Sequence, residues 1–262
     1  MHERHLNKKK YFEEQSNTTL RYVIPFIEDV FAIEKGIDVL EIGCGHGGNL
    51  KPFLDAGCNV TGIDIIDDHV ALARESYKDH PYSRNLRLIS GDIYLVKEGE
   101  LPQFDLIVMK DVIEHIHNQE RFMGYVKGFL KPGGRMFIAF PPWRMPFGGH
   151  QQVCESRLLS VAPYIHLFPD PVYRFILHSF GERETRIAEL LEVKSTGLSI
   201  ERFRTIVAKE KFEVEKVQLY LVNPNYEIKF RLKPRVQFPA FTSLPYFRDF
   251  LTTCCYYLIR KR

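Results

Sequence analysis

The feature that most constrains this 262-residue chain is the segment Asp38-Val-Leu-Glu-Ile-Gly-Cys-Gly-His-Gly-Gly48. It begins as a short apolar run interrupted by one acid, Glu41, and it ends in glycines at 43, 45, 47 and 48. A buried strand that enters a helix through a glycine-rich turn lets the main chain approach a nucleotide closely. We expect Gly43 to adopt a positive φ, and the later glycines to leave out side chains where a ligand lies against the backbone. The helix that follows is expected to begin near Asn49 and to direct its N–H groups at the same place.

Strands and helices alternate through the next hundred residues, which is typical of an α/β fold with a doubly wound, mostly parallel sheet. A helix over residues 11–33, bent or restarted at Pro25, comes before the glycine segment. After it, the sequence predicts strands at 59–64, 86–90, 104–109 and 135–140, and helices at 49–56, 67–77 and 119–130. Asp67 or Asp68 is the expected cap of the second of these helices. The run 131–134, Lys-Pro-Gly-Gly, is a stop signal before the last strand.

The pattern changes after Phe140, where residues 141–196 are rich in aromatic residues, proline and histidine. This segment predicts helices near 155–160, 171–180 and 182–192, with no clear strand. After this segment the sequence predicts a helix over 199–209 capped by Ser199, a strand at 212–222, a loop at 224–245 and a strand at 251–259. We therefore expect one domain over 1–262 with four parts. These are an N-terminal helical lid (1–35), a cofactor-binding half (36–140), a helical and aromatic insertion (141–196) and the C-terminal part of the sheet (197–262).

Composition limits the classes of partner and compartment. The net charge of +3 is too close to neutral to indicate, by itself, binding to nucleic acid or to a membrane. The five cysteines are odd in number and contain no Cys-x-x-Cys pair, which favours a reducing compartment. The N-terminus lacks the apolar core of a secretory signal, and no run approaches the roughly 18 apolar residues of a membrane-spanning helix. We expect a soluble, cytoplasmic protein.

The glycine spacing alone suits two nucleotide cofactors, NAD and S-adenosylmethionine. Asp64 follows Gly43 by 21 residues at a strand end, where an acid can accept both ribose hydroxyls. Glu41 favours S-adenosylmethionine, because a buried carboxylate near its ammonium and sulfonium is stabilised, whereas the pyrophosphate of a dinucleotide would be repelled. Asp92 can accept a hydrogen bond from the adenine amino group, with Ile93 beside the ring. An NAD-dependent oxidoreductase is the disfavoured alternative.

At this point the chain resembles the class I S-adenosylmethionine-dependent methyltransferases. The resemblance covers about residues 36–140 in correct order, through the segments 39–47, 62–64, 91–92, 104–116 and 130–137. It implies the Rossmann-like methyltransferase fold, with seven strands of which the last is antiparallel to the rest, and here with a helical insertion after the fifth strand. It also implies S-adenosylmethionine as cofactor.

The resemblance further implies where each part of the cofactor binds. Residues at the positions of Glu41, Gly43 and Gly45 surround the methionine end, and Lys110 or Asp111 lines the methionine pocket. The other residues expected at the cofactor are Asp64 for ribose, Asp92 and Ile93 for adenine, and Cys44 and Ile65 beside them.

The methyl acceptor is expected at the end of the fourth strand, which continues as Asp111-Val-Ile-Glu-His115. Methyltransferases that act on exocyclic amino groups of nucleic-acid bases carry an Asn/Asp-Pro-Pro-aromatic motif there, and this chain does not. The segment Asp111-x-x-Glu-His115 instead resembles that of the quinone-biosynthesis O-methyltransferase type. This resemblance implies a small-molecule acceptor methylated at a hydroxyl oxygen. His115 is a candidate base for the hydroxyl proton, or else a structural histidine bonded to the following loop. His150, in a Gly-Gly turn, either approaches the acceptor or orders the aromatic segment around it.

A metal is an alternative use of the same residues. Asp111, Glu114 and His115 offer two oxygens and a nitrogen at a spacing that shares one helical face, and His150 can add a fourth ligand. Whether they bind a metal is left open, as are the acceptor and the oligomeric state. Tyr11 and Phe12 are candidates to close over the cofactor, or else they pack the N-terminal helix onto the rest of the domain. Two other functions are kept beside the proposed one, a nucleic-acid methyltransferase and a non-catalytic protein that binds S-adenosylmethionine.

Overall fold

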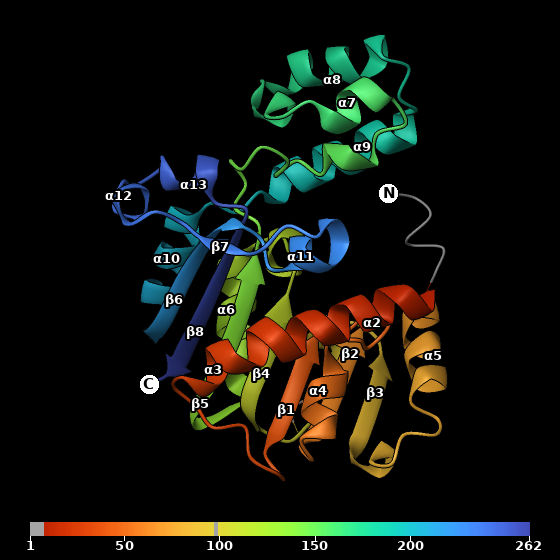
Figure 1. Ribbon diagram of the computed structural model, residues 1–262, viewed down its shortest axis with the longest axis vertical. Coiled ribbons are helices and arrows are strands. Elements are labelled where there is room, and N and C mark those ends of the chain that lie inside the picture. The colour runs from red at the N-terminus through yellow and green to blue at the C-terminus, as the bar shows by residue number, and fades with distance from the viewer. Residues whose placement is uncertain (1–7, 97–98) are drawn as a thin grey trace.

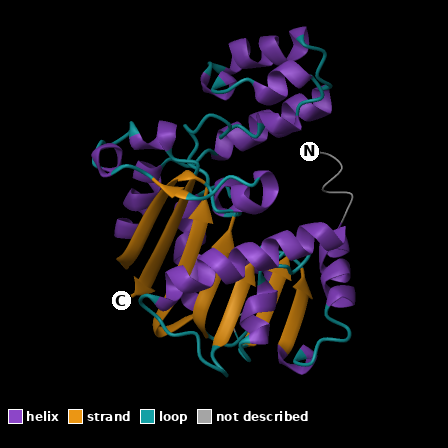
Figure 2. Cartoon of the chain, in the orientation of Figure 1, coloured by secondary structure: helices purple, strands orange, loops and turns teal. Residues whose placement is uncertain are grey.

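The computed structural model describes residues 8–96 and 99–262, so residues 1–7 of the expected N-terminal lid lie outside the described residues. The chain folds into one mixed sheet with helices on both of its faces (Figures 1 and 2). The strand order is β3-β2-β1-β4-β5-β8-β6-β7. The strands are β1 (Asp38–Ile42), β2 (Asn59–Asp64), β3 (Leu86–Ser90), β4 (Phe104–Lys110), β5 (Leu130–Phe140), β6 (Phe212–Val222), β7 (Arg235–Val236) and β8 (Cys254–Lys261).

The predicted doubly wound fold is confirmed, with one difference in strand count. Strands β1 to β5 pair in parallel, and β8 lies antiparallel to both β5 and β6. The described residues contain eight strands rather than the expected seven. The additional strand β7 has two residues and pairs antiparallel with the edge of β6, inside the segment 224–245 that was expected to be a loop.

Alternate residues of the central strands enter two different cores, which is why these strands read as continuous apolar runs. In β4, Ile107 and Met109 pack with the helices on one face, while Leu106 and Val108 pack with those on the other. The N-terminal helices and α4 cover the second face (Figure 1). Because the first five strands are parallel, their carboxyl ends meet at one edge of the sheet, where α/β proteins bind ligands.

The helices follow the predicted pattern, with shifts at some ends. They are α2 (Lys8–Thr18), α3 (Ile24–Glu28), α4 (Leu50–Asp55), α5 (Asp67–Ser76), α6 (Gln119–Val126), α7 (Arg157–Val161), α8 (Asp170–Ser179), α9 (Glu184–Thr196), α10 (Ile200–Lys209), α11 (Asn225–Phe230), α12 (Pro239–Thr242) and α13 (Arg248–Leu251). A π-helical turn separates α2 from α3, which restarts with Pro25 in its first turn as expected. Ser199 caps α10 as predicted, but Ile66 is the N-cap of α5, so the expected Asp67 or Asp68 cap is wrong.

The insertion after β5 forms a helical lobe beyond the carboxyl edge of the sheet. Figure 1 shows α7, α8 and α9 packed together at this end of the molecule. They enclose a small apolar core of their own, made of Cys154, Leu159, Tyr173, Leu177, Ile187 and Leu190. The helices predicted within 141–196 are therefore confirmed, while the division of the chain into functional parts stays a prediction. The longest described helix, α9, has 13 residues, and no described helix is long and apolar enough to cross a membrane.

The glycine turn after β1 serves the protein's own packing more than we expected. Gly43 has the predicted positive φ of 73°, and a Cβ atom there would lie 2.4 Å from the side chain of Val112. A Cβ on Gly48 would lie 2.5 Å from the carbonyl oxygen of Phe12 in α2. Only Gly45, with a φ of 51°, would direct a Cβ into open space among the four glycines of the turn. The expectation that the later glycines make room for a ligand therefore fits Gly45 and not Gly48.

A Gly48→Ala variant is expected to lose about 1–3 kcal/mol of unfolding free energy, because its methyl group would meet a backbone oxygen that cannot rotate away. Urea unfolding of the ligand-free protein measures this loss. Gly128→Ala is the matched control, since a Cβ there meets nothing within 4 Å. Equal stability of the Gly48→Ala variant and the wild type would contradict the proposed packing role of this glycine.

Candidate active site

The loop after β4 lies directly against the glycine turn, because the side chain of Val112 occupies the space that a Cβ on Gly43 would need. The backbone N–H of Asp111 donates to the carbonyl of Ala139 in β5 at 2.8 Å, which fixes the start of this loop. Lys110 and Asp111 are thus held at the carboxyl edge of the sheet, beside the end of β1.

Asp64 joins the two loops at the carboxyl ends of β1 and β2. One carboxylate oxygen accepts the N–H of Gly45 at 2.7 Å, and the other accepts the N–H of Ile66 at 2.9 Å. The imidazole of His69 lies 3.7 Å from the second oxygen. Each carboxylate oxygen has two lone pairs, so both retain capacity to accept a ligand hydroxyl. The expected ribose-binding acid is therefore oriented by the glycine turn itself.

The other residues expected around the nucleoside differ in their surroundings. The Ile65 side chain is 70% exposed beside Asp64, whereas Ile93 is buried. Asp92 accepts the N–H of Tyr94 at 2.9 Å and caps the short 3₁₀ turn that contains Ile93. Cys44 is fully buried, with its sulfur against β2, and its backbone N–H donates to Ile63 at 3.1 Å. The Cys44 side chain therefore belongs to the core rather than to an open ligand surface.

Glu41 is buried beneath the glycine turn, and its hydrogen-bond partner within the chain is a side-chain amide. One carboxyl oxygen accepts from the amide of Asn49 at 2.8 Å, and Asn49 in turn accepts from the hydroxyl of Thr19 at 2.8 Å. The other oxygen of Glu41 has no hydrogen-bond partner among the described residues. Burial raises the pKa of Glu41 to about 8, although Asn49 and Lys110 oppose the shift. The buried Lys110 has its ammonium 3.5 Å from Asp111.

Three separate segments enclose a small cavity beside Lys110. It has a volume of about 30 Å³ and is lined by α2, by the end of β4 and by α11, through Tyr11, Glu14, Gln15, Thr18, Lys110, Asp111, Asn225 and Lys229. That volume is enough for one or two water molecules but far below the several hundred Å³ typical of ligand pockets. The ring of Tyr11 also contacts His46 of the glycine turn at a centroid distance of 5.6 Å. The expected lid residue Tyr11 is thus closed over this edge.

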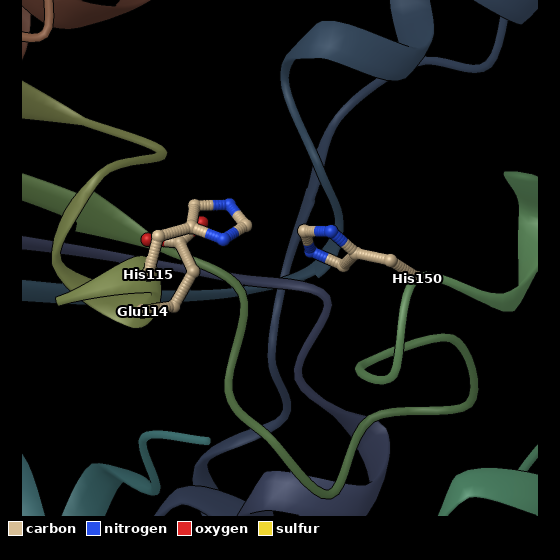
Figure 3. A group of neighbouring side chains, drawn as sticks. All are labelled: Glu114, His115 and His150. Carbon is tan, nitrogen blue, oxygen red and sulfur yellow. The ribbon is translucent and has the colours of Figure 1, made fainter. Parts of the chain in front are cut away.

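Glu114, His115 and His150 come together at the same end of the molecule. Their potential ligand atoms all lie within 4.8 Å of one another, and Figure 3 shows the two imidazoles directed toward each other from the loops after β4 and β5. The ring centroids of His115 and His150 are 5.0 Å apart. Asp111 does not belong to this group: it has a φ of 57° and precedes the 3₁₀ turn Ile113–His115. The expected single helical face of Asp111, Glu114 and His115 is therefore wrong.

The electrostatics of this group favour neutral side chains. Partial burial lowers the pKa of His115, while burial together with the neighbouring His115 lowers that of His150 to about 4. Burial and the charge of Asp111 raise the pKa of Glu114 well above its usual range. Both imidazoles are therefore unprotonated near neutral pH, the state in which a histidine can accept a proton or bind a cation.

The structural roles weighed for the two histidines find no support in hydrogen bonds of their imidazoles. Neither the imidazole of His115 nor that of His150 forms a hydrogen bond with any described residue. The aromatic segment is ordered instead by the buried His166, whose Nε2 lies 2.8 Å from the carbonyl oxygen of Trp143 and whose ring packs edge-on against the indole.

Four residues near the site were not identified from the sequence. They are Asn49 beneath Glu41, His166 beside Trp143, and Asn225 and Lys229 of α11 at the cavity next to Lys110. The segment that contains α11 was expected to be a loop, because prolines recur at positions 224, 234, 239 and 245. Nothing in the spacing of the sequence connects residue 225 with residue 110.

Comparison with known proteins gives a consistent assignment. Residues 12–167 match a family model described as a methyltransferase domain. The chain is 30% identical over 105 residues to a ubiquinone biosynthesis O-methyltransferase of Sinorhizobium fredii, covering 40% of this chain and 41% of that protein. It is also 30% identical over 129 residues to the enzyme of that name from Bartonella bacilliformis, covering 47% and 51% of the two chains. The chain thus spans about half, or less, of the length of these curated relatives.

Solved structures share the fold at low sequence identity. Phosphoethanolamine N-methyltransferase 2 of Haemonchus contortus, in complex with S-adenosylmethionine, superposes with a TM-score of 0.58 at 16% identity, over 94% of this chain and 52% of that one. Geranyl diphosphate C-methyltransferase of Streptomyces coelicolor gives 0.57 at 12% identity, over 92% and 80%. The resemblance predicted from the sequence motifs is confirmed. Because the family model spans more than half of its residues, this protein belongs to the methyltransferase domain family.

Proposed function

We propose that this methyltransferase transfers the methyl group of S-adenosylmethionine to a hydroxyl oxygen of a small molecule. The observation that carries the choice of oxygen is the pair of neutral imidazoles, His115 and His150, at the carboxyl edge of the sheet. The names of the curated relatives support an oxygen acceptor. The two solved structures described above act by name on nitrogen and on carbon, so the fold alone does not select the acceptor atom.

The cofactor would lie along the ends of β1 and β2. Gly45 leaves open space there, and the Asp64 carboxylate beside it has lone pairs for the two ribose hydroxyls. At the methionine end, the ammonium of Lys110 suits the cofactor's carboxylate, and the carboxylate of Asp111 suits its ammonium. Since the cavity at Lys110 holds only about 30 Å³, we propose that α2 acts as a lid that carries Tyr11 away when the cofactor enters.

The reaction is an in-line displacement at the sulfonium methyl group. The bond between sulfur and the methyl carbon breaks as the acceptor oxygen bonds to that carbon, and the electron pair stays on sulfur. His115 accepts the hydroxyl proton, because its lowered pKa keeps the imidazole unprotonated at neutral pH. His150 positions the acceptor from the opposite side, and the rest of the rate enhancement comes from alignment.

A metal-assisted form of the same reaction is the second candidate. Glu114, His115 and His150 provide one carboxyl group and two imidazoles within 4.8 Å, and one oxygen of the buried Glu114 has no hydrogen-bond partner among the described residues. A divalent cation held there would lower the pKa of a bound hydroxyl group. Titration of the chelator-treated protein with Mn²⁺ and Zn²⁺ in a calorimeter, with Glu114→Gln as the comparison, distinguishes the two forms.

The proposed function is tested by incubating the protein with methyl-labelled S-adenosylmethionine and fractionated metabolite extract, followed by mass analysis of the labelled product. An O-methylated small molecule supports the proposal. A product methylated at nitrogen or carbon would overturn the choice of oxygen. Cofactor binding without any turnover would instead favour the non-catalytic binding protein, and tight binding of NADH without affinity for S-adenosylhomocysteine would reject the cofactor assignment.

Asp64→Ala is expected to weaken S-adenosylmethionine binding by about 1–3 kcal/mol, because it removes charge-assisted hydrogen bonds to ribose. Isothermal titration measures the affinity. Asp68→Ala is the matched control, since Asp68 is an exposed acid in the first turn of the adjoining helix α5. Unchanged affinity of the Asp64→Ala variant would contradict the ribose assignment.

A further inference from the structure

The C-terminal third of the chain carries an exposed apolar surface that the proposed reaction does not use. We call residues 229–251 the apolar segment. It contains α12, α13 and the edge strand β7, which Figure 1 shows beside β6. Its large apolar side chains have exposed fractions between 39% and 70%, and they are Phe230, Leu232, Val236, Phe238, Phe241, Leu244, Tyr246, Phe247 and Leu251. Clusters of this kind on a folded protein mark surfaces that bind proteins or membranes.

The apolar segment is fixed in place by buried polar groups. The N–H of the buried Gln237 donates to Leu219 of β6 at 2.8 Å. The buried Arg248 forms an ion pair with Glu201 and donates to the carbonyl of Thr242 at 2.9 Å. Asp249 is fully buried and accepts the N–H of Ile200 at 3.4 Å. These bonds hold the backbone while the apolar side chains face outward, so their exposure is a property of the folded state.

The exposed charged residues within the apolar segment all carry positive charge. Lys229, Arg231, Lys233 and Arg235 alternate with apolar residues at the start of the segment, and the only acid within 229–251 is the buried Asp249. Arg231, Lys233 and Arg235 are exposed and form no ion pair with any described residue. Cationic side chains next to exposed aromatic rings match the anionic headgroups and the acyl boundary of a bilayer.

We propose that the apolar segment docks the enzyme on an anionic lipid surface, with the cations on the lipid phosphates and the phenylalanines at the boundary with the acyl chains. The charge pattern argues against a second copy of this chain as the occupant. A symmetric dimer would bring the same patch from each subunit together, so the like charges of Arg231, Lys233 and Arg235 would repel across the axis. The proposal does not rest on the identity of the methyl acceptor.

Co-sedimentation with vesicles tests this proposal without an activity assay. We expect the full chain to bind vesicles of phosphatidylcholine with added phosphatidylglycerol far better than phosphatidylcholine alone, and to lose this binding as salt is raised. The Arg231→Glu/Lys233→Glu variant should lose roughly 30-fold or more in binding, because each cation near the surface contributes about fivefold. The Phe238→Ser/Phe247→Ser variant should lose roughly tenfold or more on both kinds of vesicle.

Phe175→Ser is the matched control, because Phe175 of α8 is 70% exposed, as is Phe247, but lies in the helical lobe. It should bind vesicles as the wild type does. Thermal melts followed by circular dichroism check that each variant is folded, and the charge and phenylalanine variants test the surface independently. Failure of the wild type to bind either vesicle, or equal binding by all variants, would overturn the proposal. Dimers of the wild type that the phenylalanine variant dissociates in sedimentation would show a second copy on this surface instead.

Discussion

We expect the His115→Gln variant to lose roughly 10²- to 10⁴-fold in kcat, with little change in its affinity for S-adenosylmethionine. The imidazole of His115 faces that of His150 at a centroid distance of 5.0 Å and is kept unprotonated by its lowered pKa, whereas glutamine has similar size but cannot take up a proton. Initial rates with the acceptor found by label transfer measure the loss. The wild-type rate should also fall at low pH as the imidazole becomes protonated, with a midpoint below the ordinary histidine range because its pKa is lowered.

His117→Gln controls for the loss of a nearby imidazole. His117 lies two residues further along, with a side chain that is 64% exposed and paired with Glu192. This variant should keep the wild-type kcat. If the His115→Gln variant loses activity but its remaining rate still decreases at low pH as in the wild type, another group accepts the proton. If added imidazole restores the rate of a His115→Ala variant, proton transfer rather than folding was lost.

Much of the fold followed from local patterns, because short runs of apolar and β-branched residues between polar or glycine residues indicate strands. The strands at 59–64, 86–90 and 212–222 lie where they were expected, each in a run bounded by polar or glycine residues. The stop signal at 131–134 misplaced the start of β5, which begins at Leu130. The irregular register between Phe104 and Leu106 accommodates these residues in the strand, a tertiary effect that local propensity does not include.

The site was predictable only where its residues follow strand ends in sequence. Asp64, Lys110 and His115 each come directly after or near the end of a parallel strand, so the topology brings them to one edge. The partners of these residues could not be predicted, because they come from packing between distant segments. Asn225 reaches the Lys110 cavity from α11, and the glycine at 48 is required by α2.

The pH dependence of folding is expected to change when Glu41 becomes glutamine. In the ligand-free wild type, burial raises the pKa of Glu41 from 4.5 to about 8. The folded chain therefore holds a proton that the unfolded chain releases between these values. Its contribution to stability is present below pH 4.5 and is lost as the pH rises through about 8, at up to roughly 1.4 kcal/mol for each pH unit. The free energy of unfolding of the Glu41→Gln variant should not show this decrease with rising pH.

This prediction is tested by how the free energy of unfolding changes with pH, and not by its value at any one pH. Glutamine can still accept the hydrogen bond from Asn49, but its own amide donors face the position where one oxygen of Glu41 has no partner among the described residues. An amide donor of the glutamine without a partner lowers the free energy of unfolding of the variant by an amount that does not vary with pH. Urea unfolding of both proteins from pH 5 to pH 8 separates the two effects, with Glu34→Gln as a control for removing an exposed acid. A constant difference across this range would mean that Glu41 is ionised in the folded chain, with Lys110 as its counter-charge.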